Sequence, residues 1–204
     1  METTKNISSQ ELIFAGSTLS LRVAVDIDGV LADQVTLILA KLNIKYGLRL
    51  TKNDIIQWDQ KIKDTNIKYE IETALLDKNF VLSLPIIPGS ERGMGFLYNN
   101  HYVIVATARP TETEEATRTW VSNHFKFHDF CNTKGKQKDC VLSNILIDDY
   151  IPNIKHFALR KGIGLLFSQP WNQERDELEK LIEENKVFCC NNWEDVISAI
   201  KEIA

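Results

Sequence analysis

The chain has 204 residues, of which 44% are hydrophobic and 25% are charged, and its formal net charge is −4. This composition is typical of a globular protein with one sizeable core and room for a small inserted domain. The sequence has no apolar run of about 18 residues, as a membrane-spanning helix requires, and no run of five like charges. We therefore expect no membrane partner, and nothing indicates a nucleic-acid partner. The four cysteines lack CxxC spacing and the first ten residues lack a secretory pattern, which favours a cytoplasmic protein with reduced thiols.

The first predicted strand is the short, almost wholly apolar run Leu21–Val25. Residues 1–19 before it are polar and rich in serine and threonine, and we expect an N-terminal extension there. Directly after the strand come Asp26 and Asp28, within the stretch DIDGVLAD. Carboxylates at the end of a buried strand cost several kcal/mol unless a partner compensates for their lost hydration. The stretch is therefore either a polar strand end or a cation-binding, reactive site.

The next fifty residues are mainly helical in pattern. Apolar residues recur at helical spacing in three stretches, which are residues 35–47, a segment opening at Thr51, and residues 66–77. Thr51 and Asp54 have the spacing of a capping box, and the prolines and glycine of residues 84–90 end the pattern. A helical block of this length does not fit a single crossover between strands, so we predict an inserted cap at residues 34–84.

Strands and helices alternate in the second half of the chain. Buried apolar runs predict strands at residues 101–108, 144–149, 162–167 and 187–190. Helices are predicted at residues 112–124, after Pro152, at 172–185 and at 192–203. This alternation favours an α/β, Rossmann-like fold, with a parallel sheet flanked by helices. The core domain would comprise residues 20–33 and 85–204.

Polar side chains follow three of the predicted strands. In addition to the first pair of aspartates, Thr107 ends the second strand and Asp148 and Asp149 end the third. Ligands of open parallel sheets bind at the carboxyl ends of the strands, so these side chains should converge. Lys138 lies ten residues before Asp148, on the segment that leads into the third strand.

These residue types suit phosphoryl chemistry. Converging carboxylates repel one another and favour a hard divalent cation with oxygen ligands, for which Mg²⁺ is suited. With a metal present, one aspartate can act as a nucleophile while another sits near protonation. Thr107 and Lys138 can hold phosphoryl oxygens, and Gly29 allows the sharp turn that directs backbone N–H groups at an anion.

The segments DIDGVLAD, TAR, and Lys138 before NILIDDY, in that order, resemble the four motifs of the haloacid-dehalogenase-like (HAD) phosphatase superfamily. The resemblance implies that Asp26 attacks phosphorus and becomes an aspartyl-phosphate, and that Asp28 is the general acid and base. It further implies phosphate binding by Thr107, Ala108 and Lys138. The implied metal ligands are Asp26, Asp28, Asp148 and Asp149.

YGLRLTKNDIIQWD, KNFVLSLPIIPGS, LIDDYIPNI and FSQPWN resemble the 5′(3′)-deoxyribonucleotidase branch, which has a small helical cap. Trp58 matches an aromatic position in that family's base pocket, with Phe80 and Trp171 as weaker candidates. Arg109 either contacts the substrate or pairs with the acidic run Glu112–Glu115. Two departures from the family, Leu75 in place of a pocket tryptophan and TARP as the second motif, leave the base specificity open.

The leading prediction is a Mg²⁺-dependent phosphomonoesterase for nucleoside monophosphates, with 5′(3′)-deoxyribonucleotides as the first substrates to test. An HAD phosphatase for a nucleic-acid 3′-phosphate or a small phosphometabolite is the alternative. A phospho-accepting regulatory domain also surrounds Mg²⁺ with acids, but it would need neither the cap nor Asp28. The sequence leaves the oligomeric state open, with a homodimer as one option.

Overall fold

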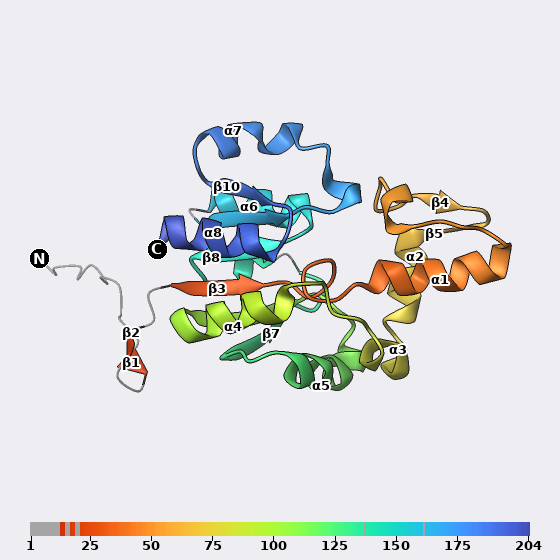
Figure 1. Ribbon diagram of the computed structural model, residues 1–204, viewed down its shortest axis with the longest axis horizontal. Helices are drawn as coiled ribbons and strands as arrows, with labels where there is room; N and C mark the ends of the chain where they lie inside the picture. The colour runs from red at the N-terminus through yellow and green to blue at the C-terminus, as the bar shows by residue number, and fades with distance from the viewer. Residues whose placement is uncertain (1–12, 15–16, 19–20, 137, 161) are drawn as a thin grey trace, which may run out of the picture.

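The central feature of the computed structural model is a six-stranded sheet of order β10-β9-β8-β3-β6-β7 (Figure 1). The structure describes residues 13–14, 17–18, 21–136, 138–160 and 162–204. The strands are β3 (Arg22–Val25), β6 (Tyr102–Thr107), β7 (Asp129–Asn132), β8 (Ile145–Asp148), β9 (Ile163–Phe167) and β10 (Val187–Cys190). All neighbouring strands of this sheet are parallel. The predicted α/β, Rossmann-like fold is therefore confirmed.

Helices cover both faces of the sheet. Successive side chains of a strand point to opposite faces, and Val23 and Val25 of β3 accordingly lie in one apolar cluster while Ala24 lies in another. The first cluster contains buried residues of α4 (Ser90–Asn100), α5 (Glu114–His124) and α8 (Trp193–Ile203). The second contains buried residues of α6 (Ile151–Leu159) and α7 (Glu179–Glu183). Helices and apolar side chains therefore cover both faces of the sheet, so we expect a ligand-binding site at the ends of the strands.

Residues 34–84, called the insertion below, extend beyond the carboxyl end of β3 (Figure 1). The insertion contains α1 (Gln34–Tyr46), a hairpin of β4 (Lys61–Ile62) and β5 (Thr65–Asn66), α2 (Ile67–Ala74) and α3 (Lys78–Leu82). Asp33 caps α1 by accepting the N–H of Thr36, and Gly47 ends it with φ of 63°. The insertion therefore begins within a few residues of Asp28, the second aspartate of the opening motif.

In the insertion, one predicted helix is absent and another is shorter than predicted. The helix expected from Thr51 is only a 3-10 turn, η1 (Lys52–Asp54). The capping box of Thr51 and Asp54 forms, but the side chain of Gln60 then bonds the backbone of Ile56 and Asp54 and diverts the chain into the hairpin. The helix expected at residues 66–77 ends at Ala74, because Asp77 caps a new helix, α3.

The helix predicted at residues 172–185 is also shorter than expected. Only α7 is α-helical, preceded by the 3-10 turns η4 (Pro170–Asn172) and η5 (Asp176–Leu178). The side chains of Asn172 and Arg175 bond nearby backbone carbonyls, which competes with helix formation.

In the core domain, α4 and β7 were not predicted. Two glycines interrupt the helical pattern of α4, and Gly93 is needed because a Cβ there would lie 2.0 Å from the Trp193 ring. The four residues of β7, DFCN, form an edge strand that includes two polar residues.

The predicted N-terminal extension comprises residues 1–19. Most of residues 1–19 lie outside the described residues, and the described part pairs as an antiparallel hairpin of β1 (Ile13–Phe14) and β2 (Ser17–Thr18). Within the part of the chain that the structure describes, no helix has both the length and the apolar character needed to cross a bilayer.

Candidate active site

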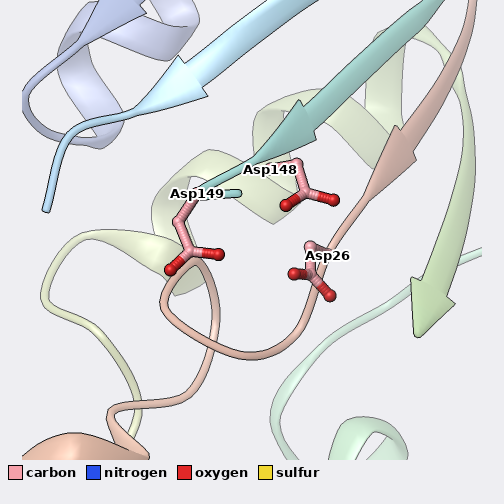
Figure 2. A group of neighbouring side chains, drawn as sticks. All are labelled: Asp26, Asp148 and Asp149. Atoms are coloured by element: carbon pink, nitrogen blue, oxygen red, sulfur yellow. The ribbon is translucent and has the colours of Figure 1, made fainter. Parts of the chain in front are cut away.

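Three carboxylates meet at the carboxyl edge of the sheet. Asp26 follows β3, Asp148 ends β8, and Asp149 is the next residue (Figure 2). Each offers an oxygen within 4.8 Å of an oxygen of the others, and all three residues are at most 6% exposed. The two strands are neighbours in the sheet, with Val25 opposite Ile147, so the ladder itself brings these aspartates together. The predicted convergence is thus present in the structure.

Lys138 lies between two of these carboxylates. It starts the 3-10 turn η3 (Lys138–Cys140), and its Nζ is 2.6 Å from Oδ1 of Asp26 and 2.9 Å from Oδ2 of Asp148. Its side chain is 4% exposed, so both ion pairs are shielded from water. Because unpaired buried charges are strongly unfavourable, each partner depends on the others for its stability.

The electrostatics of the cluster show an excess of negative charge. The pKa of Asp26 is raised to about 7. Burial is the main cause, Lys138 opposes the shift, and Asp148 and Asp28 add to it. Burial, Asp148 and Asp26 likewise raise the pKa of Asp149 well above its usual value. Although burial lowers the pKa of Lys138, the charges of Asp148 and Asp26 raise it above the ordinary value. One ammonium thus faces three carboxylates, an arrangement that a divalent cation with oxygen ligands would stabilise.

The two neighbouring aspartates of NILIDDY differ in their free oxygens. Both oxygens of Asp148 are engaged, by the backbone N–H of Tyr150, the amide of Asn153 and the ammonium of Lys138. Asp149 accepts one side-chain hydrogen bond, from Nε1 of Trp171 to its Oδ2 at 2.9 Å. Asp149 therefore has an oxygen available for a metal, whereas Asp148 holds Lys138 in place.

Asp149 does not cap the following helix. The N-cap residue of α6 is Tyr150, and the N–H of Tyr150 is bonded by Asp148. This helix was predicted to begin after Pro152, but it begins at Ile151, so Pro152 lies in its first turn. The Asp149 side chain is thereby left facing the site.

Gly29 allows the loop after Asp28 to fold back tightly. Its φ is 76°, and a Cβ at this position would lie 2.3 Å from Oδ2 of Asp149. The Gly29 peptide is held from both sides, since its N–H donates to Gln34 and its carbonyl accepts from Gln169. The close approach of backbone to carboxylate explains why glycine is needed here.

Arg109 pairs with Asp28. Its Nε and Nη2 donate to the two carboxylate oxygens at 2.9 and 2.8 Å, a bidentate geometry that fixes the plane of the carboxylate. The Arg109 side chain is 1% exposed and that of Asp28 is 22% exposed. The alternative pairing of Arg109 with Glu112–Glu115 was wrong, because the side chain turns inward onto Trp120 instead.

Thr107 and Ala108 occupy the end of β6 beside this pair. Thr107 is buried, and its hydroxyl accepts the backbone N–H of Arg109 at 3.2 Å, while its carbonyl accepts from Thr133. Ala108 is exposed and lines the cavity described next. Residues 107–109 therefore place the Ala108 backbone at the site and also provide Arg109, the partner of Asp28.

A cavity of about 720 Å³ opens above the carboxylates. Asp26, Asp28 and Lys138 lie at one side of it, and residues of the insertion form another wall. The apolar part of that wall consists of Trp58, Ile71, Leu75 and, from the core, Trp171. Trp58 and Trp171 are paired, with ring centroids 5.6 Å apart. Trp58 thus lines the cavity, whereas Phe80 does not line it and is 4% exposed within the core.

In segment 169–172, only Trp171 was predicted to belong to the site, as a weaker candidate for the base pocket, and no role was predicted for Gln169 or Asn172. Gln169 bonds Gly29, Trp171 bonds the Asp149 side chain, and Asn172 bonds the Asp149 carbonyl at 2.7 Å. Segment 169–172 comes directly after the strand that ends at Phe167, at the carboxyl edge of the sheet. This position was the signal in the sequence that could have indicated a role in the site.

Comparison with known proteins places the chain in a family. Residues 20–201 match the family described as 5′ nucleotidase, deoxy (pyrimidine), cytosolic type C protein. The chain belongs to this family. It is therefore an HAD-type phosphatase, a 5′-nucleotidase-like hydrolase, as its motifs predicted.

Individual relatives agree with this family membership. A 5′(3′)-deoxyribonucleotidase of Bacillus subtilis (strain 168) is 29% identical over 177 residues, which cover 85% of this chain and 95% of that protein. A 5′(3′)-deoxyribonucleotidase of Bacillus phage SPbeta has the same identity and coverage. An HAD family hydrolase of Deinococcus radiodurans R1, solved with phosphate and sodium bound, shares the fold with a TM-score of 0.57 at 12% identity. That match covers 89% of this chain and 95% of the other.

Proposed function

We propose that this nucleotidase is a Mg²⁺-dependent phosphomonoesterase that hydrolyses nucleoside monophosphates, in particular 5′(3′)-deoxyribonucleotides, through an aspartyl-phosphate. The observation that carries the proposal is the buried cluster of Asp26, Asp148, Asp149 and Lys138 at one side of the cavity. Two relatives named as 5′(3′)-deoxyribonucleotidases support the choice of substrate.

The donor set fits a divalent metal. The resemblance to HAD phosphatases implies such an ion, and burial together with neighbouring carboxylates raises the pKa values of Asp26 and Asp149, a cost that a cation would offset. We propose that Asp26, Asp149 and the backbone carbonyl of Asp28 hold Mg²⁺, with Asp148 behind them. When bound, the ion would keep Asp26 ionised and offset the charge of the substrate phosphate.

In the first step, an Asp26 oxygen attacks phosphorus and the bond from phosphorus to the nucleoside oxygen breaks. Asp28 donates a proton to that leaving oxygen, and Lys138 and the Ala108 backbone bind phosphoryl oxygens. Arg109 holds the Asp28 carboxylate while this transfer takes place. Positioned proton transfer of this kind contributes about 10²–10⁴-fold to a rate.

In the second step, Asp28 takes a proton from a water molecule, and the water oxygen attacks phosphorus. The bond between phosphorus and Asp26 breaks, releasing inorganic phosphate and restoring the carboxylate. Asp28 ends this step protonated and ready for the next substrate, so the cycle balances.

We further propose that the insertion serves as a cap over the cavity and contacts the nucleoside. Trp58, which lines the cavity beside Trp171, offers a surface for a planar base, and Ile71 and Leu75 offer apolar contacts. A planar, amphipathic base suits such a wall better than a small charged metabolite does.

Phosphate release from purified protein tests the proposal. The substrates are all ribo- and deoxyribonucleoside 5′- and 3′-monophosphates, a 3′-phosphorylated oligonucleotide and a phosphosugar, each with Mg²⁺ or with EDTA. We expect Mg²⁺-dependent turnover with deoxyribonucleotides first, and its loss by about 10⁴-fold or more in Asp26→Asn, as for removal of a covalent nucleophile. Asp33→Asn is the control, because Asp33 caps α1 and pairs with Lys52 but does not line the cavity. Preference for the oligonucleotide or phosphosugar would refute the nucleotide assignment.

A further inference from the structure

Trp171 connects the insertion to the carboxylate cluster. Its indole ring pairs with Trp58 of the insertion, while its Nε1–H donates to Oδ2 of Asp149 at 2.9 Å. Lys52, also in the insertion, places its Nζ 5.4 Å from the centre of the Trp171 ring. A single half-buried side chain therefore contacts the cluster on one edge and the insertion on its face.

The Asp149 side chain has few other restraints. It accepts one side-chain hydrogen bond among the described residues, whereas Asp148 accepts three hydrogen bonds. Its backbone is fixed separately, because Asn172 donates to its carbonyl. The orientation of the Asp149 carboxylate thus depends on Trp171, and the position of Trp171 depends on its contacts with Trp58 and Lys52.

We propose that Trp171 is a positioning residue, which orients Asp149 toward the metal and makes that orientation depend on the insertion. The inference rests on the proposed function, since it requires Asp149 to be a metal ligand. Hydrogen bonds from neighbouring groups orient metal ligands, and their loss costs about 10–100-fold in metal affinity. Removing one indole N–H should therefore weaken metal binding without removing any ligand.

The test is the Mg²⁺ affinity of the protein without substrate, measured by isothermal titration calorimetry. Trp171→Phe keeps a ring against Trp58 and removes the N–H, and we expect about tenfold weaker Mg²⁺ binding. Trp58→Phe is the matched control, since it also replaces an indole by a phenyl ring in the same pair, and its affinity should equal that of the wild type. Trp58→Ala removes the ring contact from the insertion and should weaken Mg²⁺ binding by less than Trp171→Phe does.

Each outcome decides the inference. If Trp171→Phe binds Mg²⁺ as tightly as the wild type, Trp171 does not position Asp149, although the proposed function stands. If Trp171→Phe binds Mg²⁺ more weakly but Trp58→Ala binds it as tightly as the wild type, Trp171 acts without the insertion and the coupling is refuted. If the wild-type protein binds no Mg²⁺, the metal role of Asp149 and this inference fail together. Should Trp171→Phe not fold, Trp58→Ala still tests the connection from the other side.

Discussion

Lys138 and Asp26 form a buried ion pair, with Nζ and Oδ1 2.6 Å apart, and the same ammonium reaches Asp148 at 2.9 Å. The proposed nucleophile is thus held by a cation that belongs to the protein. The pair also lies beside Asp149, whose charge has no ammonium partner of its own among the described residues. Keeping these carboxylates ionised and buried therefore costs free energy in the folded state, and the proposed metal would offset that cost.

Replacing Lys138 by methionine should destabilise the fold. Asp26 and Asp148 would lose their shared cation, and breaking a buried ion pair costs about 3–5 kcal/mol in the free energy of unfolding. Urea unfolding in EDTA measures this loss, and adding Mg²⁺ should recover part of it. Lys136→Met, at an exposed position of the same loop, should unfold like the wild type. A loss below about 1 kcal/mol in Lys138→Met would contradict the pairing.

Alanine at Gly29 should damage the site, and alanine at Gly47 should not. Both glycines have positive φ, 76° and 63°, so each substitution costs about 1–2 kcal/mol of backbone strain. Only at Gly29 does the added Cβ meet a carboxylate, Oδ2 of Asp149 at 2.3 Å, whereas Gly47 faces open space. We expect Gly29→Ala to lose both Mg²⁺ affinity and turnover, and Gly47→Ala to retain both at a slightly lower melting temperature. Equal behaviour of the two variants would show that the close approach is unimportant.

Arg109→Gln should affect substrates according to their leaving group. The variant loses the bidentate hold on Asp28, so protonation of a nucleoside oxygen should slow by about 10²-fold. The leaving group of p-nitrophenyl phosphate needs no proton, so the rate of hydrolysis of this substrate should fall much less. The ratio of the two rates is the measurement, because it does not depend on the amount of folded enzyme. Arg118→Gln, which removes a pairing with Glu114 on the surface of α5, should leave the ratio unchanged.

Stability in the absence of metal should fall as the pH rises. The pKa of Asp26 is about 7 in the folded protein against an ordinary 3.8, so between these values the folded state holds a proton that the unfolded state has lost. The contribution of Asp26 to stability is therefore greatest below pH 3.8 and is lost as the pH rises through 7. The raised pKa of Asp149 acts in the same direction.

Mg²⁺ should counter this loss, because it binds the ionised carboxylates. We expect saturating Mg²⁺ to raise the melting temperature by about 5 °C or more at pH 8 and by much less at pH 5. Differential scanning calorimetry at both pH values, with Mg²⁺ or with EDTA, gives the comparison. Asp33→Asn should show the wild-type pattern. The same rise at pH 5 and pH 8 would mean that Mg²⁺ does not bind at this cluster.

The strands and their polar ends could be predicted from the sequence because they depend on local pattern. Apolar runs such as Leu21–Val25 are recognisable in isolation, and the carboxyl ends of parallel strands must share an edge. The sequence alone therefore predicts that Asp26, Asp148 and Asp149 belong to one site. The boundaries of short helices were predicted less well, since side chains such as Gln60 bond the backbone and end them.

The partners of the site residues depended on tertiary structure. Whether Arg109 would face the neighbouring glutamates or Asp28, 81 residues away, could not be read from spacing. The same holds for Trp171, whose hydrogen bond to Asp149 and contact with Trp58 join three distant parts of the chain. The order of the motifs and the strands that carry them can thus be read from the sequence alone. Which of these groups touch depends on how distant segments pack against one another, because such contacts follow from the whole fold rather than from a local period.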